Sequence, residues 1–205
     1  MNNKFLRAVK VAMLCKNSKG IMIFSVACFF IAPVLMIVSD EFFFLGGILT
    51  VYSWMFFTQF LALVDLSEAA AASPLKKYMA TTMQDIITGV GALISLGSIL
   101  VSTHIRGANR ECFLAYAFIC IFLIYFGVVY KWYWGGLITV CLLFGAAMPL
   151  TLILTGKIEL SVVTLDVVGG VAIVFGWAVG LIFRHALYKL PMAPIMRKSL
   201  ERQCR

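Results

Sequence analysis

The sequence predicts an all-α integral membrane protein with six transmembrane helices, on three observations. First, 62% of its 205 residues are hydrophobic and only 13% are charged, whereas soluble domains are about 45–50% apolar and about 25% charged. Second, the mean hydropathy is +1.00. Third, the apolar segments approach the roughly 20 residues that a helix needs to cross the hydrocarbon core. They also lack the alternation of apolar and polar residues found in membrane β-strands.

Six segments meet these criteria, and together they predict a single transmembrane domain over residues 1–205. The segments are residues 21–38, 42–64, 86–103, 113–130, 134–154 and 162–183. Residues 1–20 precede the bundle of residues 21–183, and residues 184–205 are predicted to form a basic cytoplasmic tail. The first segment does not resemble a cleavable signal, because charged residues and further spans follow it in place of a small-residue cleavage site.

The first 20 residues predict an amphipathic helix at the membrane interface. Phe5, Val9 and Met13 recur at four-residue spacing, and the basic residues of this stretch fall on another face. A basic amphipathic helix beside a span lies in the membrane interface rather than crossing it. The alternative is a loosely ordered basic tail that only orients the first span.

The distribution of basic residues predicts that both termini are cytoplasmic and that the protein lies in the cell membrane. With the N-terminus inside, 14 of the 17 Lys and Arg residues fall on the inner side, and the other three are Arg106, Arg110 and Lys157. Cytoplasmic loops are enriched in these residues. The net charge of +8 therefore reports topology and favours contact with anionic membrane lipids. A nucleic-acid partner is excluded, because the sequence predicts no soluble basic surface.

No catalytic or cofactor-binding group is predicted within the spans. Ionisable residues in a membrane are costly and are functional candidates for that reason. Asp166 lies about one helical turn into the sixth span, and Thr58 and Gln59 lie deep in the second, but none has an obvious catalytic partner. His104 is expected outside and His185 inside, so the two histidines should not share a site. The chain is therefore predicted not to be an enzyme.

Nucleotide and metal sites are also not expected. The glycines of "TGVGAL" at residues 88–93 lie within a span and lack the Lys-Ser/Thr end of a phosphate-binding loop. The six cysteines have no metal-ligand spacing, and in apolar surroundings cysteine behaves as a small hydrophobic residue. They are Cys15, Cys28, Cys112, Cys120, Cys141 and Cys204.

Two features of the last spans concern helix packing. Ala172, Gly176 and Gly180 recur every four residues in the sixth span, and small residues at this spacing let two helices approach closely. The partner is a helix of the same chain or, alternatively, a second copy of the protein. Pro149, late in the fifth span, removes a backbone hydrogen bond and is expected to kink or break that helix.

Residues 65–85 are predicted to be the largest cytoplasmic connection, and they predict a corner between two short helices. Asp65 can cap a helix start, and the four alanines of residues 69–72 favour helix. Ser73 is then expected to cap a second helix, with Pro74 at its first position. The alternative is a loop whose lysines reach toward lipid headgroups.

This connection resembles the coupling element in the permease subunits of type-two ATP-binding-cassette exporters. The resemblance rests on "EAAAASPLKK" at residues 68–77, which runs from an acidic residue through small residues and Ser-Pro to two lysines. The six-span topology, the interfacial N-terminal helix and the inward-facing termini are also similar to that family. The resemblance implies that Glu68, Lys76 and Lys77, together with Asp65, Ser73 and Pro74, contact a separate ATPase subunit.

The same resemblance implies the rest of the assembly. Two permease subunits, identical or different, would be served by two ATPase copies that bind ATP and Mg²⁺, while this chain binds no cofactor. A transport path would be lined by spans one, two and five, where Thr58, Gln59 and Pro149 are the candidate residues. The apolar spans suit an amphipathic or hydrophobic substrate, such as a peptide, a lipid or a drug-like molecule.

Two other functions fit the six-span topology. One is the substrate-binding membrane component of a vitamin uptake system, although the predicted outer loops are too short to cover a polar vitamin. The other is an accessory or immunity protein that binds a peptide within the membrane and transports nothing.

Overall fold

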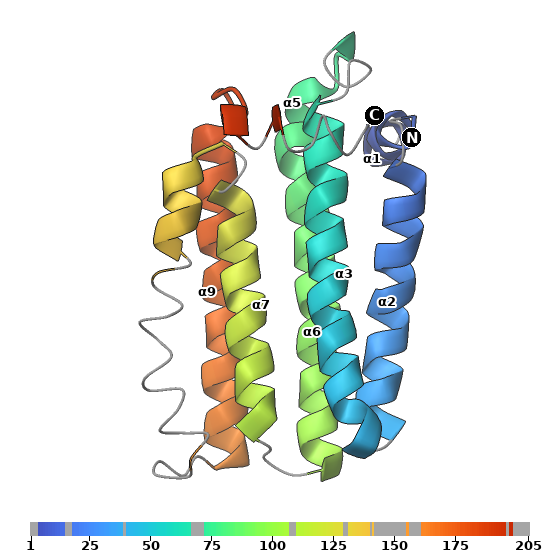
Figure 1. Ribbon diagram of the computed structural model, residues 1–205, viewed down its shortest axis with the longest axis vertical. Helices are drawn as coiled ribbons and strands as arrows, with labels where there is room; N and C mark the ends of the chain where they lie inside the picture. Colours follow the sequence, from blue (N-terminus) through green and yellow to red (C-terminus); the bar gives the residue numbers. More distant parts are fainter. Residues whose placement is uncertain are drawn as a thin grey trace.

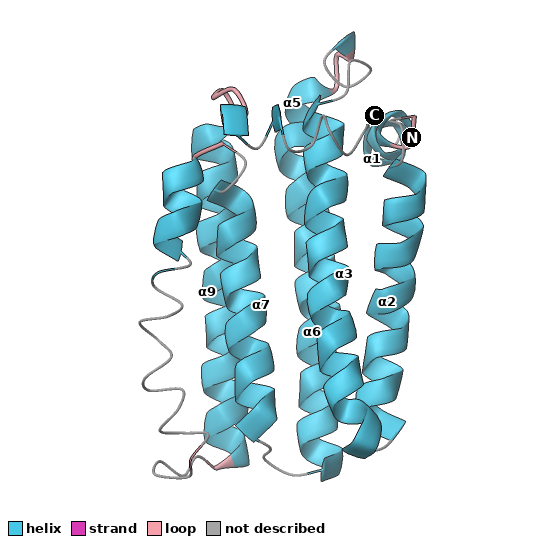
Figure 2. Ribbon diagram, viewed as in Figure 1, coloured by secondary structure: helices cyan, strands magenta, loops and turns pink. Residues whose placement is uncertain are grey.

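The computed structural model describes a helical bundle, and the described residues contain no strand (Figure 2). The described residues are 4–14, 18–38, 40–66, 72–106, 110–128, 131–139, 141, 155, 161–195 and 197–198. The all-α prediction is therefore confirmed for this part of the chain.

The elements follow one another along the chain and run back and forth along the long axis of the molecule (Figure 1). In order they are α1 (Lys4–Ala12), α2 (Ser18–Val38), α3 (Asp40–Leu66), α5 (Lys76–Tyr78), the π-helix η1 (Met79–Met83), α6 (Gln84–Arg106), α7 (Arg110–Val128) and α9 (Val162–Leu187). A further short helical stretch covers residues 133–139.

Among the described residues, four helical stretches are long and apolar enough to cross a membrane. They are Lys19–Val38, Leu45–Ala62, Lys76–Ile105 and Val162–Leu187. A shorter apolar stretch, Ala115–Tyr125, lies in α7. The protein is thus a membrane protein by the length and composition of its helices. The predicted fourth span, residues 113–130, is represented among the described residues only by this shorter stretch, and the predicted fifth span, residues 134–154, lies mostly outside them. The count of six therefore remains a prediction.

Helix α1 lies across one end of the bundle, and Figure 1 shows it end-on beside the start of α2. Its Ala8 and Ala12 are fully buried, whereas Lys4 and Lys10 are exposed. This helix packs on the π-helix η1. The predicted apolar face of Phe5, Val9 and Met13 is only partly buried, and α1 ends at Ala12, just before Met13. The fully buried positions are instead the two alanines. We call the end of the bundle that carries α1 and α5 the elbow end (Figure 1).

Two groups of helices form the bundle, and α6 joins them. Helix α2 packs on α3 and α6, and α7 packs on α9, while α6 also contacts both α7 and α9. The first group is held by the buried Trp54 of α3, whose indole N–H donates to Ser95 Oγ of α6 at 3.2 Å. Phe29 of α2 lies edge-on to the same indole ring, 5.4 Å between centroids. Helix α3 also packs on α7, so the two groups meet through both α3 and α6.

The long cytoplasmic connection predicted for residues 65–85 is shorter than expected. Helix α3 continues to Leu66, and the chain is helical again from Lys76 to Arg106 through α5, η1 and α6. The cause is burial: Met79 and Met83 are 1% and 0% exposed, and their segment η1 packs on α1 and α9. Packing of an apolar face stabilises a helix more than local propensity does. Asp85 is therefore inside a helix and not at the end of a loop.

A second boundary also differs from the prediction. The last span was expected to end at residue 183, and α9 instead continues to Leu187. Arg184 and His185 consequently belong to the helix and not to the basic tail. Both boundary corrections extend a helix at the elbow end, and they bring together the charged residues described next.

Candidate functional site

Residues 73–75 form a turn immediately before α5. The first of the two short helices predicted to meet at this corner lies mostly outside the described residues. The backbone N–H of Leu75 donates to Ser73 Oγ at 3.1 Å, and the N–H of Lys76 donates to the carbonyl of Ser73 at 3.1 Å. The helix therefore begins at Lys76, with Leu75 at its N-cap, two residues later than the expected cap at Ser73. Pro74 is exposed in this turn. We call residues 72–78 the elbow.

The two elbow lysines have different surroundings, although both are exposed. The ammonium group of Lys77 lies 5.5 Å from the centroid of the Tyr188 ring, just beyond the end of α9. Lys189 Nζ lies 5.9 Å from the same ring. Cation–π contacts at exposed sites contribute about 0.5–1 kcal/mol. Lys77 thus faces α9. Glu68 and the side chain of Asp65, which were predicted to contact the same partner as Lys77, lie outside the described residues.

A buried ionic cluster lies about two helical turns beyond the elbow. Arg184 Nε donates to Asp85 Oδ1 at 2.6 Å, and His185 Nε2 lies 2.7 Å from Asp85 Oδ2. The side chains of Arg184 and Asp85 are 3% and 12% exposed, and that of His185 is 48% exposed. We call these three residues the Asp85 cluster. It joins α6 to α9, two helices from different groups of the bundle.

The Asp85 carboxylate is fully engaged, but the Arg184 guanidinium is not. Each carboxylate oxygen has one partner from α9, so Arg184 is bound through Nε alone. Within the described part of the chain, its two Nη atoms are buried without a hydrogen-bond partner. A buried donor left unpaired costs about 1–3 kcal/mol, and more when it carries charge. The cluster therefore holds the two helices together at an energetic cost.

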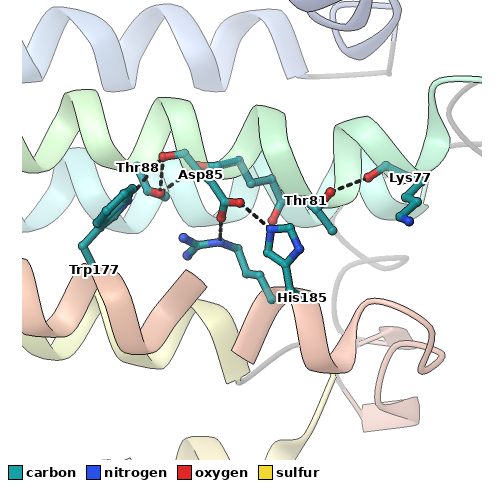
Figure 3. A network of polar contacts seen from close by, with 8 residues as sticks. Lys77, Thr81, Asp85, Thr88, Trp177 and His185 are labelled. Atoms are coloured by element: carbon teal, nitrogen blue, oxygen red, sulfur yellow. Dashed lines mark hydrogen bonds and ion pairs between the residues drawn. The ribbon is translucent and has the colours of Figure 1, made fainter. Parts of the chain in front are cut away.

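Neighbouring polar side chains position Asp85 (Figure 3). The indole N–H of Trp177 donates to the Asp85 carbonyl at 3.3 Å, and the Thr88 hydroxyl donates to the Gln84 carbonyl at 2.7 Å. Figure 3 shows Lys77, Thr81, Asp85 and Thr88 in order along one helix, with Trp177 and His185 reaching toward it from α9. At the elbow end, three polar side chains of α9 (Trp177, Arg184 and His185) thus converge on Asp85 of α6.

A second carboxylate joins the same two helices at the opposite end of the bundle. Asp166 Oδ1 of α9 accepts from the Thr103 hydroxyl of α6 at 3.0 Å and from the Tyr116 hydroxyl of α7 at 3.1 Å. His104 Nε2 lies 3.9 Å from Asp166 Oδ2, and its side chain is 73% exposed. We call these four residues the Asp166 cluster. Asp166, which has no evident partner in the sequence, therefore has partners on two helices.

The two clusters have opposite polarity. At the elbow end α6 supplies the carboxylate and α9 the cation, whereas at the opposite end α9 supplies the carboxylate and α6 the histidine. Sequence reasoning missed the Asp85 cluster because its members are about 100 residues apart. The only available signal was the rule that charges within membrane helices are functional candidates, and the predicted boundaries had placed these charges outside the spans.

The predicted transport-path residues are not brought together with either cluster. Gln59 is partly buried in α3. Thr58 lies in the same helix with its side chain outside the described set, and Pro149 lies outside the described residues altogether. Among the described residues, no group of three or more His, Cys, Asp or Glu side chains could hold a metal ion.

Comparisons with known proteins do not extend this description. No protein-family model matches the chain, and no curated protein or solved structure shows significant similarity to it. Function must therefore be argued from the residues themselves.

Proposed function

We propose that this chain is the membrane-spanning permease subunit of an ATP-driven exporter, located in the cell membrane with both termini cytoplasmic. A separate ATPase subunit, in two copies, binds ATP and Mg²⁺ and drives two permease subunits. The cargo is amphipathic or hydrophobic, because the spans are almost entirely apolar. The resemblance of residues 68–77 to the coupling element of such exporters motivates the proposal.

One observation carries it further: the elbow leads directly into a helix that is bonded to a distant helix of the bundle. The helical stretch from Lys76 to Arg106 is continuous, with one change of register at the π-helix η1, and it connects the elbow to the bundle. The Asp85–Arg184 pair then couples this stretch to α9 at 2.6 Å. A partner that moves the elbow therefore moves both groups of helices, which is what a coupling element requires.

The first test is purification of the tagged chain from its native host in mild detergent. We expect a protein with ATP-hydrolysing activity to copurify in stoichiometric amount, and we expect no hydrolysis by the permease alone because it lacks a nucleotide-binding motif. Hydrolysis by the isolated chain contradicts the proposal, as does a purified chain without any associated ATPase. A copurifying vitamin would indicate the uptake component instead.

The second test locates the coupling surface by charge reversal. The triple variant Glu68→Lys/Lys76→Glu/Lys77→Glu should reduce recovery of the ATPase and leave membrane insertion unchanged. The matched control, Arg106→Glu/Arg110→Glu/Glu111→Lys, reverses the same charges at the opposite end and should retain the ATPase. Exposed ion pairs contribute only about 0–1 kcal/mol each, so each single change should have a small effect. Equal recovery from both triple variants would exclude the elbow as the coupling surface.

A further inference from the structure

The π-helix η1 separates the elbow from the Asp85 cluster. It covers Met79–Met83 in an otherwise regular helical stretch. Lys77, which faces Tyr188 just beyond α9, precedes it, and Asp85, which bonds to Arg184 of α9, follows it. Single π-helical turns inside α-helices occur frequently at functional sites. The π-helix η1 lies between two contacts with the region of α9, and this position indicates a role in aligning them.

The π-helical turn aligns these two contacts. Lys77 and Asp85 are eight residues apart, and in a regular α-helix, at about 100° per residue, they would face directions about 80° apart. A π-helical turn contains one additional residue, because its hydrogen bonds run from i to i+5. The eight residues from Lys77 to Asp85 then complete about two turns, as seven residues do in a regular α-helix. The directions of the two side chains around the helix axis consequently differ by only about 20°. Both consequently face α9.

The side chains of η1 show why the additional residue is retained. The Thr81 hydroxyl donates to the Lys77 carbonyl at 2.8 Å, and a hydroxyl that bonds back to the i−4 carbonyl loosens and bends a helix. Met79, Thr81 and Met83 are all buried, where η1 packs on both α1 and α9. The turn is therefore held by packing on two sides and weakened in its own backbone hydrogen bonding.

We propose that η1 is the switch of the coupling element, an inference that rests on the proposed function. In the π-helical form, the elbow and the Asp85 cluster both engage α9. Conversion of η1 to regular α-helix rotates the elbow by about 100° relative to Asp85, so Lys77 leaves Tyr188 while the Asp85–Arg184 pair remains. The ATPase drives this conversion when it moves the elbow. Loops and hinges in other proteins supply such two-state elements, and here the second state is a different helical register.

Deletion of Ala80 tests the alignment without any partner. Removing one residue converts the π-helical turn to regular α-helix and keeps Lys77 and Asp85 on one face. We expect this variant to fold. We also expect Asp85→Asn to lower its thermal stability by as much as it does in the full-length chain. The control deletion of Val90, in the regular part of α6, should destroy the fold, because it rotates the rest of that helix out of register. Insertion of one alanine after Ala80 should rotate the elbow alone, so it should abolish the effect of Lys77→Ala on thermal stability and leave the effect of Asp85→Asn unchanged. An Ala80 deletion as damaging as the Val90 deletion overturns the proposed alignment.

Chemical cross-linking in the purified complex with the ATPase tests the switch. Cysteines replace Lys77 and Tyr188 in a chain whose native cysteines are changed to serine, and a short bis-maleimide joins them. We expect ATP to lower the cross-linking yield severalfold in the full-length chain and to leave it unchanged after deletion of Ala80. A yield that ATP does not change, with the ATPase still bound, overturns the switch alone. Absence of a bound ATPase overturns the proposed function, and the switch with it.

Discussion

Arg184 and Asp85 are 99 positions apart in the chain and form a buried ion pair, with Nε 2.6 Å from Oδ1. The pair connects the two groups of helices at the elbow end of the bundle. Because the guanidinium is nearly fully buried, Asp85 is its counter-ion among the described residues.

Replacement of Asp85 by asparagine should strongly destabilise the protein. The variant leaves the Arg184 charge buried without a counter-ion, and loss of one partner of such a pair typically costs about 3–5 kcal/mol. The double variant Asp85→Leu/Arg184→Met should be more stable than either corresponding single variant, because apolar residues of similar volume replace the pair. Thermal unfolding in the same detergent measures the stability of the single variants and of the double variant. The matched control is His185→Asn, which should have a small effect because that side chain is about half exposed.

At the opposite end, the hydroxyl of Tyr116 should stabilise the bundle through Asp166. Tyr116→Phe removes a hydrogen bond to a carboxylate, and such bonds contribute about 1.5–3 kcal/mol. A double-mutant cycle with Asp166→Ala isolates this contribution, because Tyr116→Phe should cost less when the carboxylate is absent. Equal costs in the two backgrounds would show that the 3.1 Å contact contributes no stability.

The glycines of α9 should differ in their tolerance of alanine. A Cβ on Gly176 would lie 2.7 Å from the carbonyl oxygen of Cys120 in α7, whereas a Cβ on Gly170 would meet only Leu96 Cδ1 at 4.0 Å. Gly176→Ala should therefore destabilise the protein by about 1–3 kcal/mol. Gly170→Ala should be neutral or stabilising, because alanine favours helix by about 0.5–1 kcal/mol over glycine. The stripe of small residues thus packs on α7 of the same chain, and equal tolerance of both substitutions would contradict this close contact.

Cysteine labelling should place position 72, in the elbow, and position 107, which follows α6 in the chain, on opposite sides of the membrane. In a chain without native cysteines, an impermeant maleimide added to intact cells should label Gly107→Cys and not Ala72→Cys. The expectation follows from the enrichment of Lys and Arg on the predicted inner side and from the position of the two ends of α6 in the bundle (Figure 1). Labelling at position 72 in intact cells would exclude the proposed orientation.

Local patterns in the sequence predicted several features because those features depend on local chemistry. The apolar runs predicted membrane-spanning helices, and the spacing of Phe5, Val9 and Met13 predicted the N-terminal helix. Ser73 and Pro74 predicted the start of a helix after a corner in the connection. The helix nevertheless begins at Lys76, two residues later than expected, because Ser73 accepts a hydrogen bond from Leu75 within a turn.

Composition and hydropathy determined by themselves that this protein is an all-α membrane protein, because the cost of exposing backbone groups to lipid leaves helices as the structure for continuous apolar runs. The tertiary structure alone decided the partners of Asp85 and Asp166, and the π-helical register that turns Lys77 and Asp85 toward α9. Those contacts join residues from 50 to 100 positions apart. They depend on how whole helices pack, and no local pattern in the sequence encodes that packing.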